Sequence, residues 1–237
     1  MDTLLLFLII GISLGFFIQT IIGFAGALIA LPFLLMVMPL TSAVAYLSIF
    51  YFISSPYYLI KEWKNIDKQL LKKLIISSLT GVVAGIILLI YAKPVLLKKA
   101  LGLFIILFVL NSIRPKKELR IGAKMKYIFG FLGGFFSGVF STGGPLYVIV
   151  VKNVTPDVRT FRATMFGVLG LVTIVRLPIL AIGGVLTLDQ FYNSLIVLPF
   201  FVLAIFLGRK VYLQLNEVLL KKIILVLLCI SGILLLF

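Results

Sequence analysis

Long apolar stretches recur along the whole chain of 237 residues, and they set the narrowest limit on how it can fold. A continuous apolar run of about 18 residues or more is typical of a membrane-spanning helix. The alternation of apolar and polar residues that a transmembrane β-strand needs is not found in the sequence. These patterns predict an all-α, polytopic membrane protein, and we place its apolar runs at residues 4–38, 42–60, 74–92, 95–113, 127–151, 163–183, 190–208 and 218–237.

The composition agrees with a membrane protein and argues against several functions. Hydrophobic residues make up 62% of the chain and charged residues 12%, against about 25% charged residues in soluble proteins. The formal net charge of +15 comes mostly from Lys and Arg between the apolar runs, where membrane topology accounts for them, so we expect no nucleic-acid partner. The chain has no His and a single Cys, Cys229, so we expect no metal, no cofactor and no disulfide within the chain.

An internal repeat divides the chain into two parts. The tetrapeptide Leu-Leu-Lys-Lys occurs at residues 96–99 and again at 219–222. Glycine-rich stretches at 15–26 and 130–145 interrupt the first apolar run of each part. The sequence therefore predicts two homologous halves, each a broken or re-entrant segment followed by three transmembrane helices. The predicted boundaries are a first membrane repeat at 1–113, a cytoplasmic linker at 114–126 and a second membrane repeat at 127–237.

The distribution of Lys and Arg leaves two alternatives for the topology. If every apolar run crosses the membrane once, the two sides carry 11 and 10 of these residues, which gives no preferred orientation. If the runs 4–38 and 127–151 each turn back at their glycines, the halves are inverted repeats, and the counts become 18 inside and 3 outside. A single helix over 4–38 would be about 50 Å long, against a hydrocarbon core of about 30 Å. We therefore favour inverted repeats in a cell (inner or plasma) membrane.

The repeated motifs resemble those of a known family. Gly23-Phe24-Ala25-Gly26, its second copy Ser141-Thr142-Gly143-Gly144-Pro145 and the two Leu-Leu-Lys-Lys helices resemble the sulfite exporter TauE/SafE family, and the likeness covers essentially the whole chain. The resemblance implies a multi-pass membrane transporter for sulfite, sulfonates or related sulfur anions.

The chemistry of the two breaks predicts an anion-binding site. Matching breaks in the two halves of a transporter are the best sequence pointer to its binding site. A half-helix that begins after a break presents free N–H groups and the positive end of its dipole. Ser141 or Thr142 can cap the second half-helix, and Pro145 fits its first position. Gly143 and Gly144 let a ligand approach the backbone, although small residues can also serve only close helix packing.

Arg176 is the one strongly charged residue well inside an apolar run. An intramembrane Arg is costly and is by default a functional hypothesis, and its guanidinium can hold two oxygens of a sulfonate or sulfite. Alternatively, it snorkels to a membrane boundary or pairs with a carbonyl freed by Pro178. Polar residues of the runs either orient the substrate or form hydrogen bonds between helices. The predicted substrate-binding residues are Gln19, Thr20, Gly23, Gly26, Ser137, Ser141, Thr142, Gly143, Gly144 and Arg176.

The remaining charges give less specific predictions. Asp67 and Asp189 stand where helices begin, so we expect them to be N-caps. No convincing buried proton carrier is left, and the choice between a proton and a sodium ion as coupling ion stays open. Lys152, Arg159 and Arg162 either attract anions to the cytoplasmic mouth or only set the orientation of the chain.

Taken together, these patterns predict a secondary transporter of a small sulfur-containing anion bound near the bilayer midplane. The alternatives are a permease for another small organic anion and a membrane subunit that needs a partner. An enzyme is not expected, because the chain has no His to activate Ser137 and no acidic pair in its apolar runs.

Overall fold

The computed structural model describes residues 3–113, 122–155, 157–212, 225–226, 229 and 232–233. Within these ranges all regular secondary structure is helical, which confirms the all-α prediction. Most of the predicted linker and most of the apolar run 218–237 lie outside the described residues. The elements are α1 (Thr3–Ile22), α2 (Gly26–Leu34), α3 (Leu40–Glu62), a 3-10 turn η1 (Trp63–Asn65), α4 (Lys68–Tyr91), α5 (Pro94–Ile113), α6 (Ala123–Phe140), α7 (Gly144–Val154), α8 (Val158–Ile182) and α9 (Leu188–Tyr212).

Several helices are long and apolar enough to cross a membrane. Among the described residues there are five of these, namely α1, α3 with η1, α4, α8 and α9, and they make the chain a multi-pass membrane protein. Large apolar side chains such as Ile87, Leu203 and Phe206 are exposed on their outer faces. These faces suit contact with lipid, where a soluble protein would carry charge.

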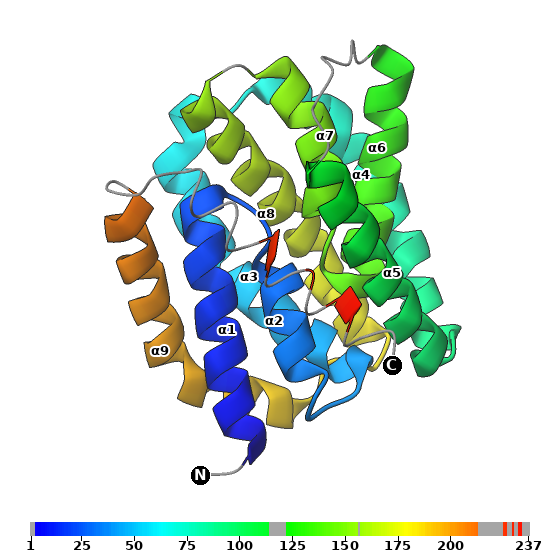
Figure 1. The fold of residues 1–237 in the computed structure, drawn as a ribbon, viewed down its shortest axis with the longest axis vertical. Coiled ribbons are helices and arrows are strands. Elements are labelled where there is room, and N and C mark those ends of the chain that lie inside the picture. The colour runs from blue at the N-terminus through cyan, green and yellow to red at the C-terminus, as the bar shows by residue number, and fades with distance from the viewer. Residues whose placement is uncertain are drawn as a thin grey trace.

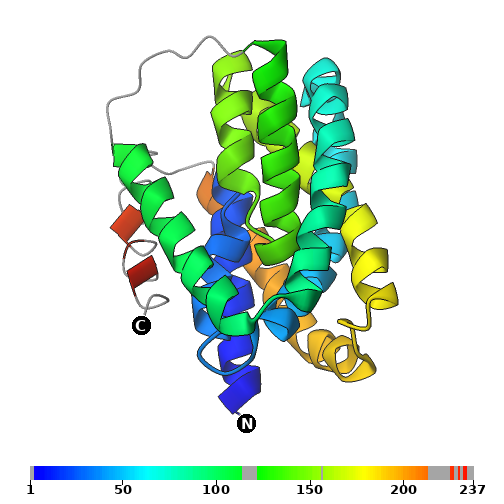
Figure 2. The same ribbon diagram turned by 90° about the vertical axis from the view of Figure 1, so that its right-hand side faces the viewer.

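Both glycine-rich runs are interrupted helices. In the run 4–38, three residues separate α1 from α2, and Gly23 and Ala25 among them have left-handed backbone, with φ of 87° and 74°. In the run 127–151, Ser141 follows α6 with φ of 60°, and a left-handed residue at this place ends a helix. The chain turns back after each break, so that α2 packs along α1 and α7 along α6 (Figures 1 and 2).

The two predicted halves are interleaved. Helix α4 of the first half packs on α6 of the second, and α9 of the second half packs on α1 of the first (Figure 2). A Cβ on Gly81, Gly85, Gly134 or Gly138 would overlap the backbone of the facing helix. Small residues let membrane helices approach this closely. Each broken helix therefore packs on an uninterrupted helix of the other predicted half.

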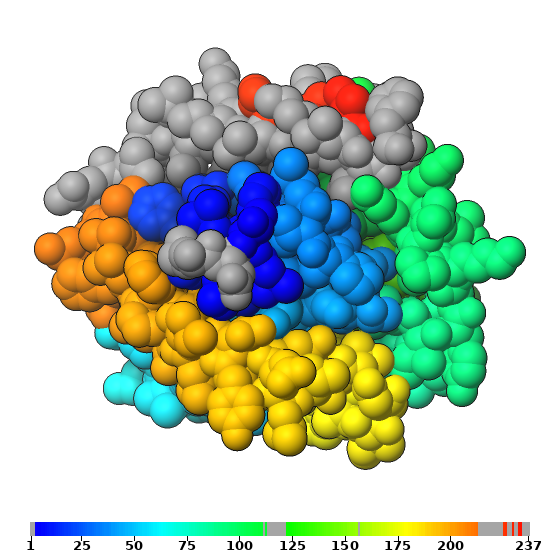
Figure 3. All heavy atoms as spheres, turned by 90° about the horizontal axis from the view of Figure 1, so that it is seen from below, coloured from blue at the N-terminus to red at the C-terminus, as the bar shows by residue number. Residues whose placement is uncertain are grey.

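Aromatic side chains fill the space between α1, α3 and α9. Phe16, Phe50 and Phe201 are buried there, with ring centroids 4.9 to 6.3 Å apart. The face of the molecule where α1 begins also carries three connections, namely those between α2 and α3, between α4 and α5, and between α8 and α9 (Figure 3). The core and these connections leave the two breaks in the interior of the bundle.

The predicted N-caps have different outcomes. Asp67 is the N-cap of α4, since its carboxylate accepts the N–H groups of the second and third helical residues at 3.1 and 3.0 Å. The prediction for Asp189 is wrong, because it is the second residue of α9. Thr187 caps this helix instead. Its hydroxyl accepts the Gln190 N–H at 3.3 Å, and the Gln190 side chain accepts the Thr187 N–H at 3.0 Å, a reciprocal capping box.

Candidate functional site

The two breaks meet inside the bundle. A Cβ added to Gly144, the first residue of α7, would lie 3.1 Å from Phe24 Cβ and 3.7 Å from the Ala25 nitrogen. Helices α2 and α7 both begin here, and neither has an N-cap side chain that binds its free N–H groups. The positive ends of two helix dipoles therefore face the same small region. A negatively charged group in that region is stabilised by both.

The glycines of the breaks are in close contact with their own chain. A Cβ on Gly26 would overlap the amide oxygen of Gln19, and one on Gly143 would overlap the hydroxyl of Ser137 and a carbonyl of α6. At these two positions glycine is therefore needed for close packing. The same contacts hold the polar ends of Gln19 and Ser137 against the backbone of the breaks. Glycine is needed at position 23 for a different reason, because its φ of 87° lies in a region that residues with a side chain rarely adopt.

Arg176 of α8 is buried beside the second break. It is 2% exposed, which contradicts the alternative that its side chain snorkels to a membrane boundary. Nη1 donates to the carbonyl of Ser137 at 2.9 Å, whereas Nε and Nη2 have no hydrogen-bond partner among the described residues. The ring centre of Tyr51 lies 5.6 Å from the guanidinium carbon. Within the described part of the chain the one ion pair joins Arg162 to Glu62, so Arg176 has no acidic partner there.

Other polar atoms near the breaks are buried without a partner. Leaving a buried polar group unpaired costs about 1–3 kcal/mol, and each such group in a native protein requires an explanation. Besides those of Arg176, the unpaired buried side-chain atoms of the described ranges are Ser13 Oγ, Gln19 Oε1, Ser137 Oγ, Ser141 Oγ, Thr142 Oγ1 and Tyr147 OH. Four of these six atoms, those of Gln19, Ser137, Ser141 and Thr142, lie in a break or in the helical turn that precedes it, where a bound polar ligand would pair them.

The prediction that Ser141 or Thr142 caps α7 is wrong. The N-cap is Gly143, and no side chain caps this helix. Ser141 instead ends α6, since its N–H binds the Ser137 carbonyl at 2.9 Å. Because Ser141 serves as the C-cap of α6, α7 begins two residues beyond Thr142, and Pro145 is its second residue rather than its first. Both hydroxyl groups are therefore left for another partner.

Tyr51 of α3, which no sequence pattern predicted, lines the space between the two breaks. Its hydroxyl accepts the Ala27 N–H, in the first turn of α2, at 3.1 Å, which leaves its own proton for another acceptor. A space too tight for a water molecule lies between the breaks. This space is lined by Ala25, Ala27, Leu28, Tyr51, Ser141, Thr142, Gly144, Pro145 and Leu169.

Thr20 is bonded to its neighbours rather than directed at the meeting point. Its hydroxyl donates to the Phe16 carbonyl at 2.7 Å and accepts from the Tyr58 hydroxyl at 2.5 Å. Its carbonyl accepts a hydrogen bond from Arg162 Nε at 3.1 Å. Thr20 therefore fits the alternative prediction, in which a polar residue forms hydrogen bonds between helices, here from α1 to α3 and α8.

Arg162, near the start of α8, supports the first break. It is 8% exposed, and its guanidinium lies 3.9 Å from the ring centre of Tyr212 and 4.0 Å from a carboxylate oxygen of Glu62. A Cβ on Gly23 would lie 2.9 Å from Arg162 Cγ. Helix α8 thus supplies one guanidinium to each break, with Arg162 and Arg176 about 21 Å apart along its axis.

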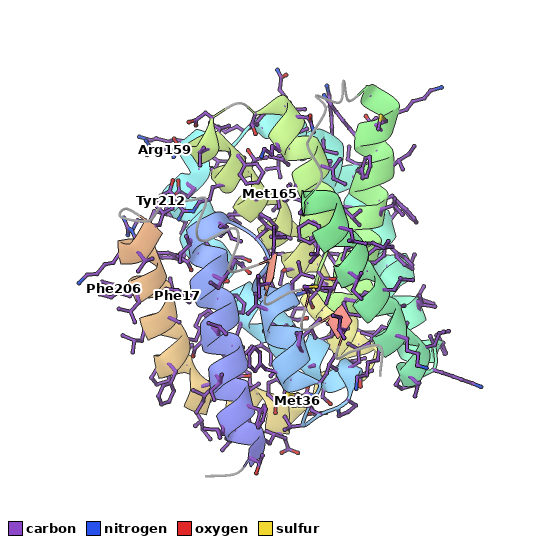
Figure 4. All side chains as sticks on the ribbon, in the orientation of Figure 1. Phe17, Met36, Arg159, Met165, Phe206 and Tyr212 are labelled. Atoms are coloured by element: carbon purple, nitrogen blue, oxygen red, sulfur yellow. The ribbon has the colours of Figure 1, made fainter. Side chains whose placement is uncertain are left out.

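The other basic residues at this end of α8 are exposed. Lys152 and Arg159 both face outward, and Figure 4 shows Arg159 at the outer end of α8, on the side where α9 finishes at Tyr212. Asp157 caps α8, and the hydrogen bond from the Thr160 N–H, at 2.8 Å, lowers the pKa of its carboxyl. The position of Lys152 and Arg159 suits a role in topology or in attracting anions.

These features define a multi-pass α-helical membrane protein in which two broken helices meet in the interior. The chain belongs to the sulfite exporter TauE/SafE family, since the model of that family matches residues 7–235. No curated protein and no solved structure matches the chain. The family is one of membrane transporters of sulfur-containing anions, which agrees with the resemblance seen in the sequence and with the expectation of a transporter rather than an enzyme.

Proposed function

We propose that the chain is a secondary transporter of a small, singly charged sulfur oxyanion, either an organosulfonate or singly protonated sulfite, which binds between the two breaks. The observation that carries the proposal is the buried guanidinium of Arg176, whose Nε and Nη2 are unpaired and which has no acidic partner among the described residues. A buried charge is strongly destabilising unless it is paired. A bound anion supplies the missing pair.

The groups around Arg176 suit the oxygens of a sulfonate. The fork of an Arg side chain binds two oxygens of one anion. A third oxygen can accept a hydrogen bond from the uncapped start of α2 or α7, or from the hydroxyl of Tyr51. Leu28 and Leu169 line the same space and add apolar surface for a short organic substituent.

A single fixed charge favours an anion with a single charge. Binding of a monoanion neutralises the site, whereas a dianion such as sulfate leaves one negative charge in a region of low dielectric constant. Arg162 lies about 21 Å away along α8 and pairs with Glu62, so it does not neutralise a second charge at Arg176. We therefore expect sulfate to be a poor substrate.

The proposal includes the inverted-repeat topology. Helix α1 begins at the lower end of the molecule and α6 at the upper end (Figure 1), which supports halves of opposite orientation. The charge count of 18 inside against 3 outside supports the same arrangement. In this arrangement the two breaks enter from opposite sides, and moving one broken helix pair at a time would expose the site to each side in turn.

Uptake into liposomes that contain only this protein tests the proposed function. We expect saturable uptake of a singly charged sulfonate, weaker uptake of sulfate, and loss of uptake in an Arg176→Gln variant that still inserts into the membrane. Arg159→Gln is the matched control, because it removes an exposed Arg from the same helix. Equal uptake by Arg176→Gln and wild type would refute the binding site, and a need for a second protein would favour the subunit alternative.

A further inference from the structure

An exposed basic cluster joins α3 to α9. Arg209 Nη1 donates to the hydroxyl oxygen of Tyr57 at 3.2 Å, and Lys61 Nζ donates to the same oxygen at 3.3 Å. The two charged nitrogens are therefore at most 6.5 Å apart, the sum of these two distances. Lys61 lies in the last turn of α3 and Arg209 in the last turn of α9, and all three residues are exposed, Tyr57 by 40%.

Among the described residues, no carboxylate neutralises the positive charge of this cluster. The ion pair between Arg162 and Glu62 is the single one in the described ranges, so neither Lys61 nor Arg209 is paired with a carboxylate there. Two like charges held this close repel each other, and the neutral hydroxyl of Tyr57 offsets little of that repulsion. Each cation also keeps further N–H groups that can donate. Converging donors with uncompensated positive charge are complementary to the oxygens of a phosphate.

The surroundings of the cluster favour a lipid over a soluble phosphate. Ile60, next to Lys61, is 81% exposed, and Phe206, one turn before Arg209, is 56% exposed. Figure 4 shows Phe206 on the outer side of α9. A free phosphate ion has no use for apolar surface, whereas the acyl chains of a phospholipid would cover it. Basic pockets between membrane helices, at the level of the headgroups, bind anionic lipids for this reason.

We propose that Tyr57, Lys61 and Arg209 bind the headgroup phosphate of an anionic phospholipid, whose acyl chains lie along Ile60 and Phe206. A zwitterionic headgroup binds less well, because its ammonium group brings a third positive charge to the cluster. The bound lipid fastens the end of α3 to the end of α9. This site is separate from the breaks and does not depend on the proposed transport function.

Thermal unfolding in detergent tests the lipid site. The purified protein is titrated with phosphatidylglycerol, with phosphatidylcholine of the same acyl chains, and with glycerol phosphate. A ligand that binds only the folded protein raises its apparent melting temperature. We expect phosphatidylglycerol to raise the melting temperature of the wild type more than phosphatidylcholine does, and glycerol phosphate at the same concentration to have no effect. Arg209→Gln is expected to lose the difference between the two lipids.

Lys72→Gln is the matched control, because it removes one exposed positive charge from α4 rather than from α3 or α9. It is expected to keep the preference for phosphatidylglycerol. Should Arg209→Gln fail to fold, Tyr57→Phe removes the shared acceptor without changing the charge and is expected to weaken the preference. Equal stabilisation by the two lipids, equal loss in Lys72→Gln, or an equal shift with glycerol phosphate would each overturn the proposal.

Discussion

Replacing Arg176 with Met is predicted to stabilise the protein while it abolishes transport. The substitution removes a buried charge whose Nε and Nη2 are unpaired in the described structure, and Met fills much of the same volume. It also removes one hydrogen bond, to the Ser137 carbonyl. That carbonyl keeps the N–H of Ser141 at 2.9 Å as a partner, so no backbone group is left unpaired.

The expected gain follows from these contacts. Desolvation of a buried ion costs several kcal/mol, and replacing buried ionic groups by apolar ones is often stabilising by about 1–4 kcal/mol. A charged hydrogen bond is worth about 1.5–3 kcal/mol, which offsets part of the gain. We therefore expect a net gain of ~2 kcal/mol for Arg176→Met. For a chain of this size that gain raises the melting temperature by about 4–8 °C.

Arg162→Met is the contrasting control, because it changes the same residue type on the same helix. Arg162 binds the Thr20 carbonyl at 3.1 Å, Glu62 at 4.0 Å and the Tyr212 ring at 3.9 Å. Loss of these contacts is expected to lower the stability by about 1–3 kcal/mol. Both variants are compared with the wild type by thermal unfolding in detergent without added anion, and by sulfonate uptake into liposomes. A lower melting temperature for Arg176→Met, or undiminished uptake, would refute the reasoning.

Three further substitutions probe the site and the fold. Gly143→Leu places a side chain where Ser137 and a carbonyl of α6 already lie, so it should abolish uptake while the protein remains in the membrane fraction. Gly122→Leu is its control: no described atom lies within 4 Å of a Cβ at this position, so uptake should be unchanged. Tyr51→Phe removes the hydrogen bond that the Tyr51 hydroxyl is proposed to donate to the anion, worth about 1 kcal/mol. The KM for a sulfonate should therefore rise about fivefold with little change in maximal rate. Asp67→Ala removes the cap of α4 and should lower the melting temperature by about 2–4 °C, which unfolding in detergent measures.

The two breaks can be predicted from the sequence because their signals are local. Glycines at 15–26 and 130–145 stand out within apolar runs, and the position of Arg176 in the middle of another run marked it as unusual. The exact caps were harder to predict, because they depend on where the preceding helix ends. Ser141 became the C-cap of α6, which no pattern in its neighbours determines. The start of α9 could have been predicted, because Thr187 and Gln190 have the three-residue spacing of a capping box. That pattern is a better predictor of the N-cap here than the carboxylate of Asp189.

No sequence pattern predicted Tyr51, and Arg162 was predicted only to attract anions to the cytoplasmic mouth or to set the orientation, because the roles of both residues depend on which helices pack together. A Tyr inside an aromatic-rich run is indistinguishable in the sequence from one that faces lipid. Arg162 stands among other basic residues of a predicted loop, where topology alone explains a charge. Only the contact of α8 with the first break brings Arg162 against Gly23. The interleaving of the halves is likewise a property of tertiary packing, since nothing in the repeat itself determines that α4 packs on α6.

Anomalous diffraction from crystals soaked with 2-bromoethanesulfonate tests most directly whether the two breaks form one anion site. The predicted result is a bromine peak between the breaks, beside Leu28 and Leu169, with the sulfonate oxygens on Nε and Nη2 of Arg176, and no such peak in Arg176→Met crystals. A wild-type peak only at another place, or none at a saturating concentration, would contradict the account.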